Sequence, residues 1–277
     1  MNPHLAHPSS VKALITSLWT HRSLIYQMAN REVIGRYRGS AMGLLWSFLN
    51  PVFMLTVYTF FFAVVLKSRW SGAGGDDSKT QFAVILFVGM IIHSLFAEVI
   101  SRAPTLILGN TNYVKKVVFP IEILTVVSVV AALFHSVISL IVLAIAFIIF
   151  NGYIPLTALL LPLVLLPFVV LITGFAWILA ALGVYVRDLA QTINVFVTVL
   201  LFLSPVFYSI QSVPEKFQMF IFLNPLTFII EQTREILIWG HTPNFLGLIL
   251  YSVIAIGVAG LGFFWFQKTR KGFADVL

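Results

Sequence analysis

Long runs of apolar residues, separated by short polar segments, dominate the chain from residue 42 onward. A helix that crosses ~30 Å of hydrocarbon, rising about 1.5 Å per residue, needs about 20 mostly apolar residues. Six runs are long enough, and they lie at 42–66, 81–103, 120–150, 156–184, 190–210 and 244–267. We therefore expect an all-α integral membrane protein with six transmembrane helices in one domain, residues 41–277.

A shorter apolar stretch at 217–230 is interrupted by Asn224-Pro225 and follows another interruption at Ser204-Pro205. Two short apolar arms joined by a polar turn are typical of a re-entrant hairpin, which is tolerated where protein surrounds the freed backbone groups. We expect Pro205, Asn224 and Pro225 to shape such a hairpin on the outer side, between the fifth and sixth spans.

Residues 1–40 follow a different pattern. Apolar residues recur there at i, i+3, i+4 and i+7, which places them on one helix face, at Val11, Leu14, Ile15 and Leu18. Aromatic residues suited to the headgroup level and arginines suited to anionic lipid come next. The pattern predicts an amphipathic helix in the cytoplasmic interface that leads into the first span. A soluble surface helix that packs on a partner is the alternative.

The composition supports a membrane protein, since 60% of the residues are hydrophobic and only 10% are charged. An ordinary soluble domain is about 45–50% apolar and about 25% charged. Soluble enzymes are therefore excluded as a class. The absence of cysteine also excludes disulfides, thiolate metal ligands and cysteine nucleophiles.

The net charge of +7 comes from Lys and Arg residues that flank the apolar runs. With six spans and both termini inside, most of them fall on the inner side, as the positive-inside rule requires. The inner set is Lys12, Arg22, Arg31, Arg36, Arg38, Arg102, Lys115, Lys116, Arg187, Lys268, Arg270 and Lys271, and the outer set is Lys67, Arg69, Lys79, Lys216 and Arg234. We expect a multi-pass protein with both termini in the cytoplasm and no nucleic-acid partner.

The sequence holds no recognisable pattern of catalytic or metal-binding residues. The six histidines are scattered, without the His-Glu-x-x-His spacing of a zinc site. The glycine-rich stretch 72–80 differs from a phosphate-binding loop, because Ala73 and Ser78 occupy the two required glycine positions. We expect no catalytic residue, metal or cofactor on this chain. His93 and His135 lie inside apolar runs, and we expect neutral hydrogen-bonded imidazoles there, with a functional role as the alternative.

Acidic and basic residues inside or beside the apolar runs are costly to place near lipid. Glu98 and Arg102 are spaced i, i+4, which predicts a charge pair along one helix. Glu231, Arg234 and Glu235 form a second cluster beyond the proline break. We expect structural pairing in both places.

Aromatic side chains are abundant, with 26 Phe, 8 Tyr and 6 Trp. Several fall roughly on one side of the first run together with an amide, and others lie on or just after the fifth run. These residues are Trp46, Asn50, Phe53 and Tyr58, followed by Phe196, Phe207 and Tyr208. Aromatic faces can stack on sugar rings without locking them in place. We predict that these residues line a substrate path, with ordinary helix packing as the alternative.

Four segments, in order, resemble the ABC-2 membrane subunits that export polysaccharides. Residues 31–51 read REVIGRYRGSAMGLLWSFLNP and are similar to the family's opening signature, with Met42 where Leu is usual, a change that conserves volume. Later motifs of the family are similar to residues 115–122 (KKVVFPIE), 186–189 (VRDL), and the pair 204–208 (SPVFY) and 224–226 (NPL). The resemblance extends from about residue 12 to the C-terminus.

The resemblance implies a homodimer in the bacterial inner membrane that works with two cytoplasmic ATP-binding subunits. Those subunits would bind ATP-Mg, so this chain would not be an enzyme. The resemblance also implies export of an undecaprenyl-pyrophosphate-linked polysaccharide, with O-antigen as the first candidate and capsule or teichoic acid left open. It places contact with the ATP-binding subunit on the inner loop, at Asn110, Asn112, Tyr113, Lys115 and Lys116.

Arg31, Arg36 and Arg38 gather where the interfacial helix meets the first span. Arginine can bind a phosphate with two hydrogen bonds at once, so we expect these residues to bind the pyrophosphate of the substrate. Fixing the topology through anionic lipid is the equal alternative.

Other functions stay open at this point. An ABC-2 exporter of a small lipophilic compound would share the fold. A membrane-embedded glycosyltransferase would need paired acids or a histidine cluster at the membrane surface, and the acids are sparse here. An ion-driven flippase would usually show inverted repeats, which this sequence does not.

Overall fold

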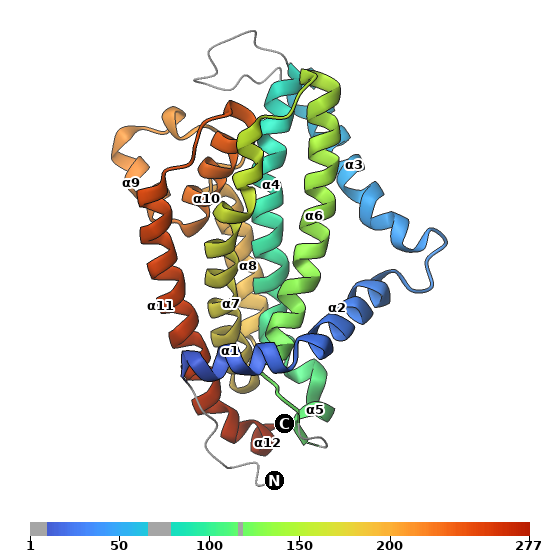
Figure 1. Cartoon of the computed structure of the whole chain (residues 1–277), viewed down its shortest axis with the longest axis vertical. Helices are drawn as coiled ribbons and strands as arrows, with labels where there is room; N and C mark the ends of the chain where they lie inside the picture. The colour runs from blue at the N-terminus through green and yellow to red at the C-terminus, as the bar shows by residue number, and fades with distance from the viewer. Residues whose placement is uncertain (1–9, 66–78, 116–118) are drawn as a thin grey trace.

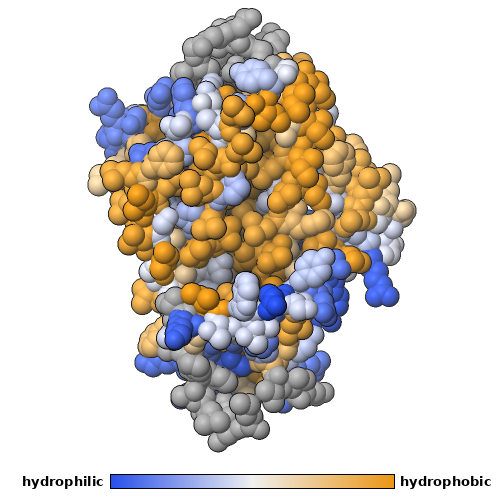
Figure 2. All heavy atoms as spheres, in the orientation of Figure 1, coloured by the Kyte–Doolittle hydropathy of each residue, from blue (hydrophilic) through white to orange (hydrophobic). Residues whose placement is uncertain are grey.

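The computed structural model describes residues 10–65, 79–115 and 119–277. Every regular element in these ranges is a helix. The long helices run side by side as a bundle, and the first two lie across one end of it (Figure 1). Hydrophobic residues cover the middle of the visible face, and hydrophilic residues gather toward its ends (Figure 2). This distribution fits a helical membrane protein.

The interfacial segment forms two helices, α1 (Val11–Thr20) and α2 (Arg22–Tyr37). The hydroxyl of Ser10 caps α1 by accepting a hydrogen bond from the Ala13 backbone N–H. The buried residues of α2 are spaced along one face, at Ile25, Met28, Ala29 and Val33. The predicted helix is therefore present, with a break at His21. Of its predicted apolar face, Leu14 and Leu18 are half-buried against the bundle, whereas Ile15 is 62% exposed.

The first apolar run forms a short 3-10 turn, η1 (Gly43–Leu45), then α3 (Trp46–Tyr58) and a π-helical turn, η2 (Thr59–Val65). The chain turns from α2 into this run through Gly39 and Gly43, whose positive φ angles of 86° and 51° favour glycine. α3 stands at the side of the bundle (Figure 1). In the helical stretch Gly43–Phe62, which includes α3, only 11% of the most apolar 18 residues are buried.

The centre of the bundle is α4 (Lys79–Arg102). In the stretch Phe82–Thr105, 78% of the most apolar 18 residues are buried. α4 contacts α6 (Ile123–Asn151) and α7 (Leu161–Tyr185), and α11 (Phe245–Thr269) packs on α7. α7 and α11 approach each other closely, because a Cβ atom on Gly262 would lie 2.3 Å from the backbone oxygen of Gly174. Small residues that let two backbones meet are a common device for packing membrane helices.

Among the described residues, five helical stretches are long and apolar enough to cross a membrane: Gly43–Phe62, Phe82–Thr105, Ile123–Phe150, Leu156–Tyr185 and Phe245–Val276. The predicted fifth span, 190–210, is the shorter helix α8 (Leu189–Leu203), with 15 residues. Such a helix is about 22 Å long, less than the hydrocarbon thickness. It ends there because Ser204-Pro205 cannot continue the helix. A sixth crossing stays a prediction.

Shorter elements complete the chain. After α8 come η6 (Ile210–Ser212), α9 (Glu215–Leu223), α10 (Pro225–Arg234) and the π-helical turn η7 (Glu235–Trp239). The end of the bundle that carries α1 also holds η3 (Ala103–Thr105), η4 (Leu108–Asn110), α5 (Thr111–Lys115), η8 (Arg270–Gly272) and α12 (Phe273–Val276) (Figure 1). η5 (Leu156–Leu160) leads into α7.

Candidate functional site

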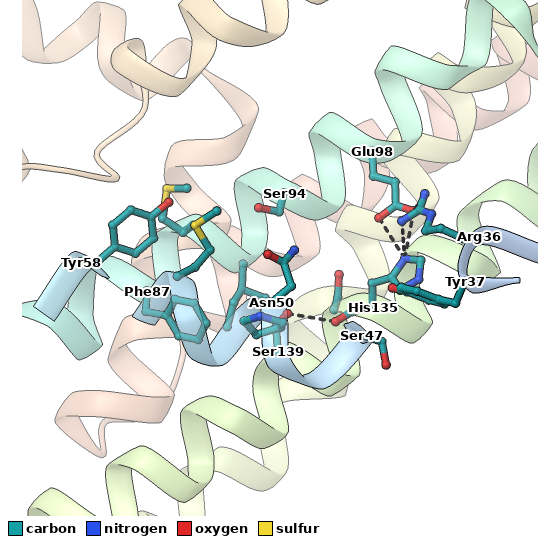
Figure 3. A pocket seen from close by; sticks show the side chains of 15 residues that line it. Arg36, Tyr37, Ser47, Asn50, Tyr58, Phe87, Ser94, Glu98, His135 and Ser139 are labelled. Atoms are coloured by element: carbon teal, nitrogen blue, oxygen red, sulfur yellow. Dashed lines mark hydrogen bonds and ion pairs between the residues drawn. The ribbon is translucent and has the colours of Figure 1, made fainter. Parts of the chain in front are cut away.

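A polar cavity of about 190 Å³ lies between α2, α3, α4 and α6 (Figure 3). Hydroxyl and amide groups from three of these helices line it, at Ser47, Asn50, Ser94, Ser136 and Ser139. A second hollow, of about 380 Å³, shares Arg36, Tyr37 and Asn50 with the first and adds Ser40 and Trp46. The two hollows therefore join at the corner where α2 turns into α3.

A charged cluster lines the cavity. The Arg36 guanidinium donates to Glu98 over 2.7 Å, and the His135 Nδ1 lies 3.0 Å from the same carboxylate (Figure 3). Glu98 is the central member and comes from α4, the helix at the centre of the bundle. A carboxylate at this position is tolerated because the Arg36 guanidinium compensates its charge and the His135 ring lies within hydrogen-bond distance. Burial raises the pKa of the nearby Tyr37 phenol, so this side chain is neutral at ordinary pH.

The predicted pairing of Glu98 with Arg102 is wrong. Glu98 pairs with Arg36, and Arg102 donates to Glu32 over 2.5 Å. Both partners lie on α2, so the two ion pairs connect the interfacial helix to α4 at two points. The i, i+4 spacing considers only neighbours on the same helix, whereas each side chain has its ion-pair partner on α2.

The three arginines predicted to bind pyrophosphate do not converge in the structure. Arg36 lines the cavity and pairs with Glu98, whereas Arg31 donates to the Tyr113 hydroxyl over 3.1 Å. Arg38 is exposed just beyond α2. Arg36 lines both of the hollows described above, and Glu98 already compensates its charge there. A role in binding pyrophosphate stays a prediction.

The predicted path residues fall into separate groups. Asn50 and Tyr58 line the cavity and Trp46 lines its opening, whereas Phe53 is 54% exposed on the flank of α3. The other group lies around the end of α8. Phe207 stacks on Phe62, with ring centroids 5.9 Å apart.

The remaining members of the predicted path are Tyr208 and Phe196. Tyr208 donates its hydroxyl hydrogen to the backbone oxygen of Phe202 over 3.2 Å. Phe196 is exposed on α8. Within one chain, the structure does not bring the aromatic residues of the two groups onto one surface.

The exposed side of α8 carries a stripe of polar residues, Gln191, Asn194 and Thr198, in a helix whose other residues are apolar except for Thr192. At about 100° per residue these positions share one face, and Phe202 continues it, while Phe196 lies about 140° from Gln191. Polar groups that face away from the bundle are unusual for a surface in contact with lipid tails. This stripe was not identified from the sequence, because its three members are separated by mostly apolar residues and come together only on one face of the helix.

The proline breaks are held together by buried polar groups. Asn224 caps α10 by accepting from the Leu226 N–H, and its amide donates to the Ser204 hydroxyl over 2.8 Å. Arg234, only 1% exposed, donates to the backbone oxygens of Pro205 and Val206 and to that of Ile85 on α4.

These bonds fix the predicted hairpin elements at Pro205, Asn224 and Pro225 against the bundle. Their position relative to a bilayer stays a prediction. The pairing of Arg234 with Glu231, at 2.8 Å, is confirmed, whereas Glu235 pairs with His241.

The loop predicted to contact an ATP-binding subunit forms η4 and α5. Asn112 and Lys115 are exposed there, and the Asn110 side chain donates to the backbone oxygen of Leu106. Tyr113 stacks on Phe119, with ring centroids 4.5 Å apart. Lys116 lies outside the described residues, as does most of the glycine-rich stretch 72–80.

The two histidines inside the bundle both have polar contacts. His93 Nε2 lies 3.2 Å from the Val197 backbone oxygen, and His135 belongs to the Glu98 cluster. In the part of the chain that the structure describes, no three His, Cys, Asp or Glu side chains gather closely enough to bind a metal. The arrangement therefore offers a polar lining and helices that are connected by ion pairs.

Comparison with known proteins gives consistent relatives along the chain. An O-antigen export system permease protein, RfbA, from Myxococcus xanthus is 25% identical over 264 residues, covering 95% of this chain and 98% of the relative. RfbA from Klebsiella pneumoniae is 25% identical and covers 92% and 95%. The polysialic acid transport protein KpsM of Escherichia coli is 22% identical and covers 83% and 88%.

The sequence profile of the family described as ABC-2 type transporter matches residues 23–238. This match includes α2, the cavity helices α3, α4 and α6, the loop formed by η4 and α5, and both proline breaks. The helical bundle and its long apolar helices agree with that assignment. The chain therefore belongs to the ABC-2 type transporter family, as a membrane subunit.

Proposed function

We propose that this chain is the membrane subunit of an ATP-driven exporter that moves lipid-linked polysaccharide, O-antigen in the first place, across the bacterial inner membrane. Two copies form the path, and two cytoplasmic ATP-binding subunits supply the energy. Both termini of each copy lie in the cytoplasm.

The observation that carries this proposal is the end-to-end similarity to three proteins named as O-antigen export permeases or a polysialic acid transporter. All three printed names describe transport of a polysaccharide. A substrate of this class fits the polar groups on otherwise apolar helices, since sugars offer many hydroxyl groups to hydroxyl, amide and aromatic side chains.

A dimer is supported by a polar surface that one copy leaves uncovered. α8 exposes the stripe of Gln191, Asn194 and Thr198. A second copy would give this stripe a counterpart away from the lipid tails. In this arrangement the predicted path residues of both copies, which form separate groups in one chain, would meet around a shared centre.

Gene deletion followed by fractionation tests the function. We expect lipid-linked polysaccharide to accumulate on the cytoplasmic face, and surface polysaccharide to return only when this chain and its ATP-binding subunit are both restored. An ATP-binding subunit with an inactive nucleotide site is the matched control and should not restore export.

Normal surface polysaccharide in the deletion strain would contradict the proposal. Altered export of a small lipophilic compound in that strain would keep the family and discard the substrate. Loss of polysaccharide synthesis itself would favour an enzyme instead.

A further inference from the structure

A buried carboxylate, Glu122, lies at the N-terminal end of α6, on the end of the bundle that carries α5. Its two oxygens have different partners: Oε1 accepts from the Ser17 hydroxyl over 2.9 Å, and Oε2 accepts from Arg270 over 2.8 Å. Ser17 belongs to α1 and Arg270 begins η8, so one carboxylate joins three separate elements. The exposed fractions of the Arg270 and Glu122 side chains are 12% and 7%.

Arg270 holds the segment before α6 at two points. Its Nη1 donates to the Glu122 carboxylate, and its Nη2 donates to the Phe119 backbone oxygen over 2.8 Å. A fourth element joins at the same place, because the Trp177 indole N–H on α7 donates to the Glu122 backbone oxygen over 3.1 Å. The guanidinium is a rigid planar fork, so these two contacts fix both the position and the direction of residues 119–122.

The clamped segment is in contact with α5. The Tyr113 ring on α5 stacks on the Phe119 ring, and the Tyr113 hydroxyl accepts from Arg31 on α2. On the other side, α12 contacts α5, and its Phe273 is completely buried against Phe266 and Tyr185. The helix that is predicted to meet the ATP-binding subunit is therefore attached on several sides.

Stability alone is a weak reason for this ion pair. Removing two charges from water is costly, and apolar side chains of similar volume often stabilise a protein as well or better. An apolar pair would fill the space but would not fix direction, which the two-point contact of Arg270 does. The pair is therefore suited to transmitting force.

We propose that Glu122 and Arg270 are positioning residues that hold α5 rigidly against α1, α7 and the η8 turn, so that movement of an ATP-binding subunit shifts the transmembrane helices instead of bending the loop. This inference rests on the proposed function, in which α5 meets that subunit.

The test compares polysaccharide exported with ATP hydrolysed, in the complete complex of this chain and its ATP-binding subunits. Arg270→Lys keeps the charge but cannot contact Glu122 and Phe119 together as the fork does. We expect the amount exported per ATP to fall about tenfold, as loss of orientation far from the chemistry can cost that much. ATP hydrolysis and the amount of assembled complex should stay close to wild type.

Two further variants complete the design. Glu122→Gln has the same shape but places an N–H₂ group where Arg270 or Ser17 donates, so it should lower the same ratio. Glu235→Gln is the matched control, because it removes an acidic partner of the exposed pair with His241, outside this junction. It should leave the ratio unchanged.

A distance measurement gives an independent readout. The chain has no cysteine, so Asn112→Cys and Asp275→Cys introduce two unique sites for spin labels, one on α5 and one on α12. Because Asn112 lies on the predicted contact with the ATP-binding subunit, the labelled full-length chain is measured without that subunit and diluted with unlabelled copies, so that each dimer holds one labelled pair. We expect a narrow distance distribution in the otherwise wild-type chain, a broad one after Arg270→Lys, and no change after Glu235→Gln.

A ratio of export to ATP hydrolysis that stays at the wild-type value would overturn the inference, whether both rates are unchanged or both fall equally. A distance distribution that stays narrow after Arg270→Lys would overturn it as well. If Arg270→Lys prevents assembly, Glu122→Gln decides by the same criteria. A wild-type complex that hydrolyses ATP without exporting polysaccharide would refute the proposed function, and the distance measurement would still decide whether Arg270 fixes α5.

Discussion

Single ionisable side chains show how this bundle tolerates charge. Glu98 and Arg102 lie on the same helix, and each pairs with a residue of α2 instead of with the other. Arg234 is fully buried, yet backbone oxygens released by the proline break accept its hydrogen bonds. In each case the charged side chain connects helices that are distant in sequence, so it helps to fix how those helices are arranged.

At this scale we predict that Arg36→Gln destabilises the protein, because Glu98 keeps a charge and loses a partner. The Arg36 side chain is 40% exposed, so solvent screens the pair and the cost should be about 1 kcal/mol. In a chain of this size that lowers the unfolding midpoint by about 2–4 °C.

The measurement is thermal unfolding of the purified protein in detergent. Arg38→Gln is the matched control, since Arg38 lies two residues away and lines neither hollow. Equal destabilisation by both changes would show that the Glu98 cluster does not explain the effect.

At the scale of elements, the most extensive contact is between α7 and α11. Gly174 and Gly262 allow the two backbones to touch, and an added Cβ at Gly174 would lie 2.7 Å from Ala259 Cα. Sequence reasoning identified both helices from their apolar length. It could not identify which glycines lie at the contact, because the chain has 17 of them.

We predict that Gly262→Ala separates α7 from α11 and costs about 1–3 kcal/mol, since backbone atoms cannot move aside as a flexible side chain can. Gly257→Ala is the control on the same helix, with no atom within 4 Å of its added Cβ. It should be neutral or stabilising by about 0.5–1 kcal/mol. Size-exclusion profiles after heating would compare them, and a greater loss for Gly257→Ala would contradict the packing described.

The loop formed by η4 and α5 gives a second prediction for an element. Replacing residues 112–116 with a Gly/Ser linker should abolish polysaccharide export, because the exposed Asn112 and Lys115 and the Tyr113 stack disappear together. The subunit should still insert into the membrane, since its apolar helices are unchanged. Export at the wild-type level would refute the assignment of this loop to the ATP-binding subunit.

For the whole molecule, periodicity and apolar length predicted the helical fold and the interfacial helices well, because lipid imposes strong constraints on both. Long-range pairing was not predictable. Glu122 and Arg270 are 148 residues apart, and no local spacing relates them. The polar stripe on α8 could have been found from three polar positions that share one helix face. The path itself was only partly predictable, because in one chain its proposed residues lie in separate groups.

The central claim is that polysaccharide passes along this chain, and cross-linking tests it most directly. A photoreactive amino acid would replace Asn194 on the polar stripe of α8 or, as the control, Ile249, which is 63% exposed on the apolar helix α11. In cells with an active ATP-binding subunit, we predict that light attaches polysaccharide to the protein at position 194 and not at 249. No attachment at 194, or equal attachment at both positions, would contradict the account.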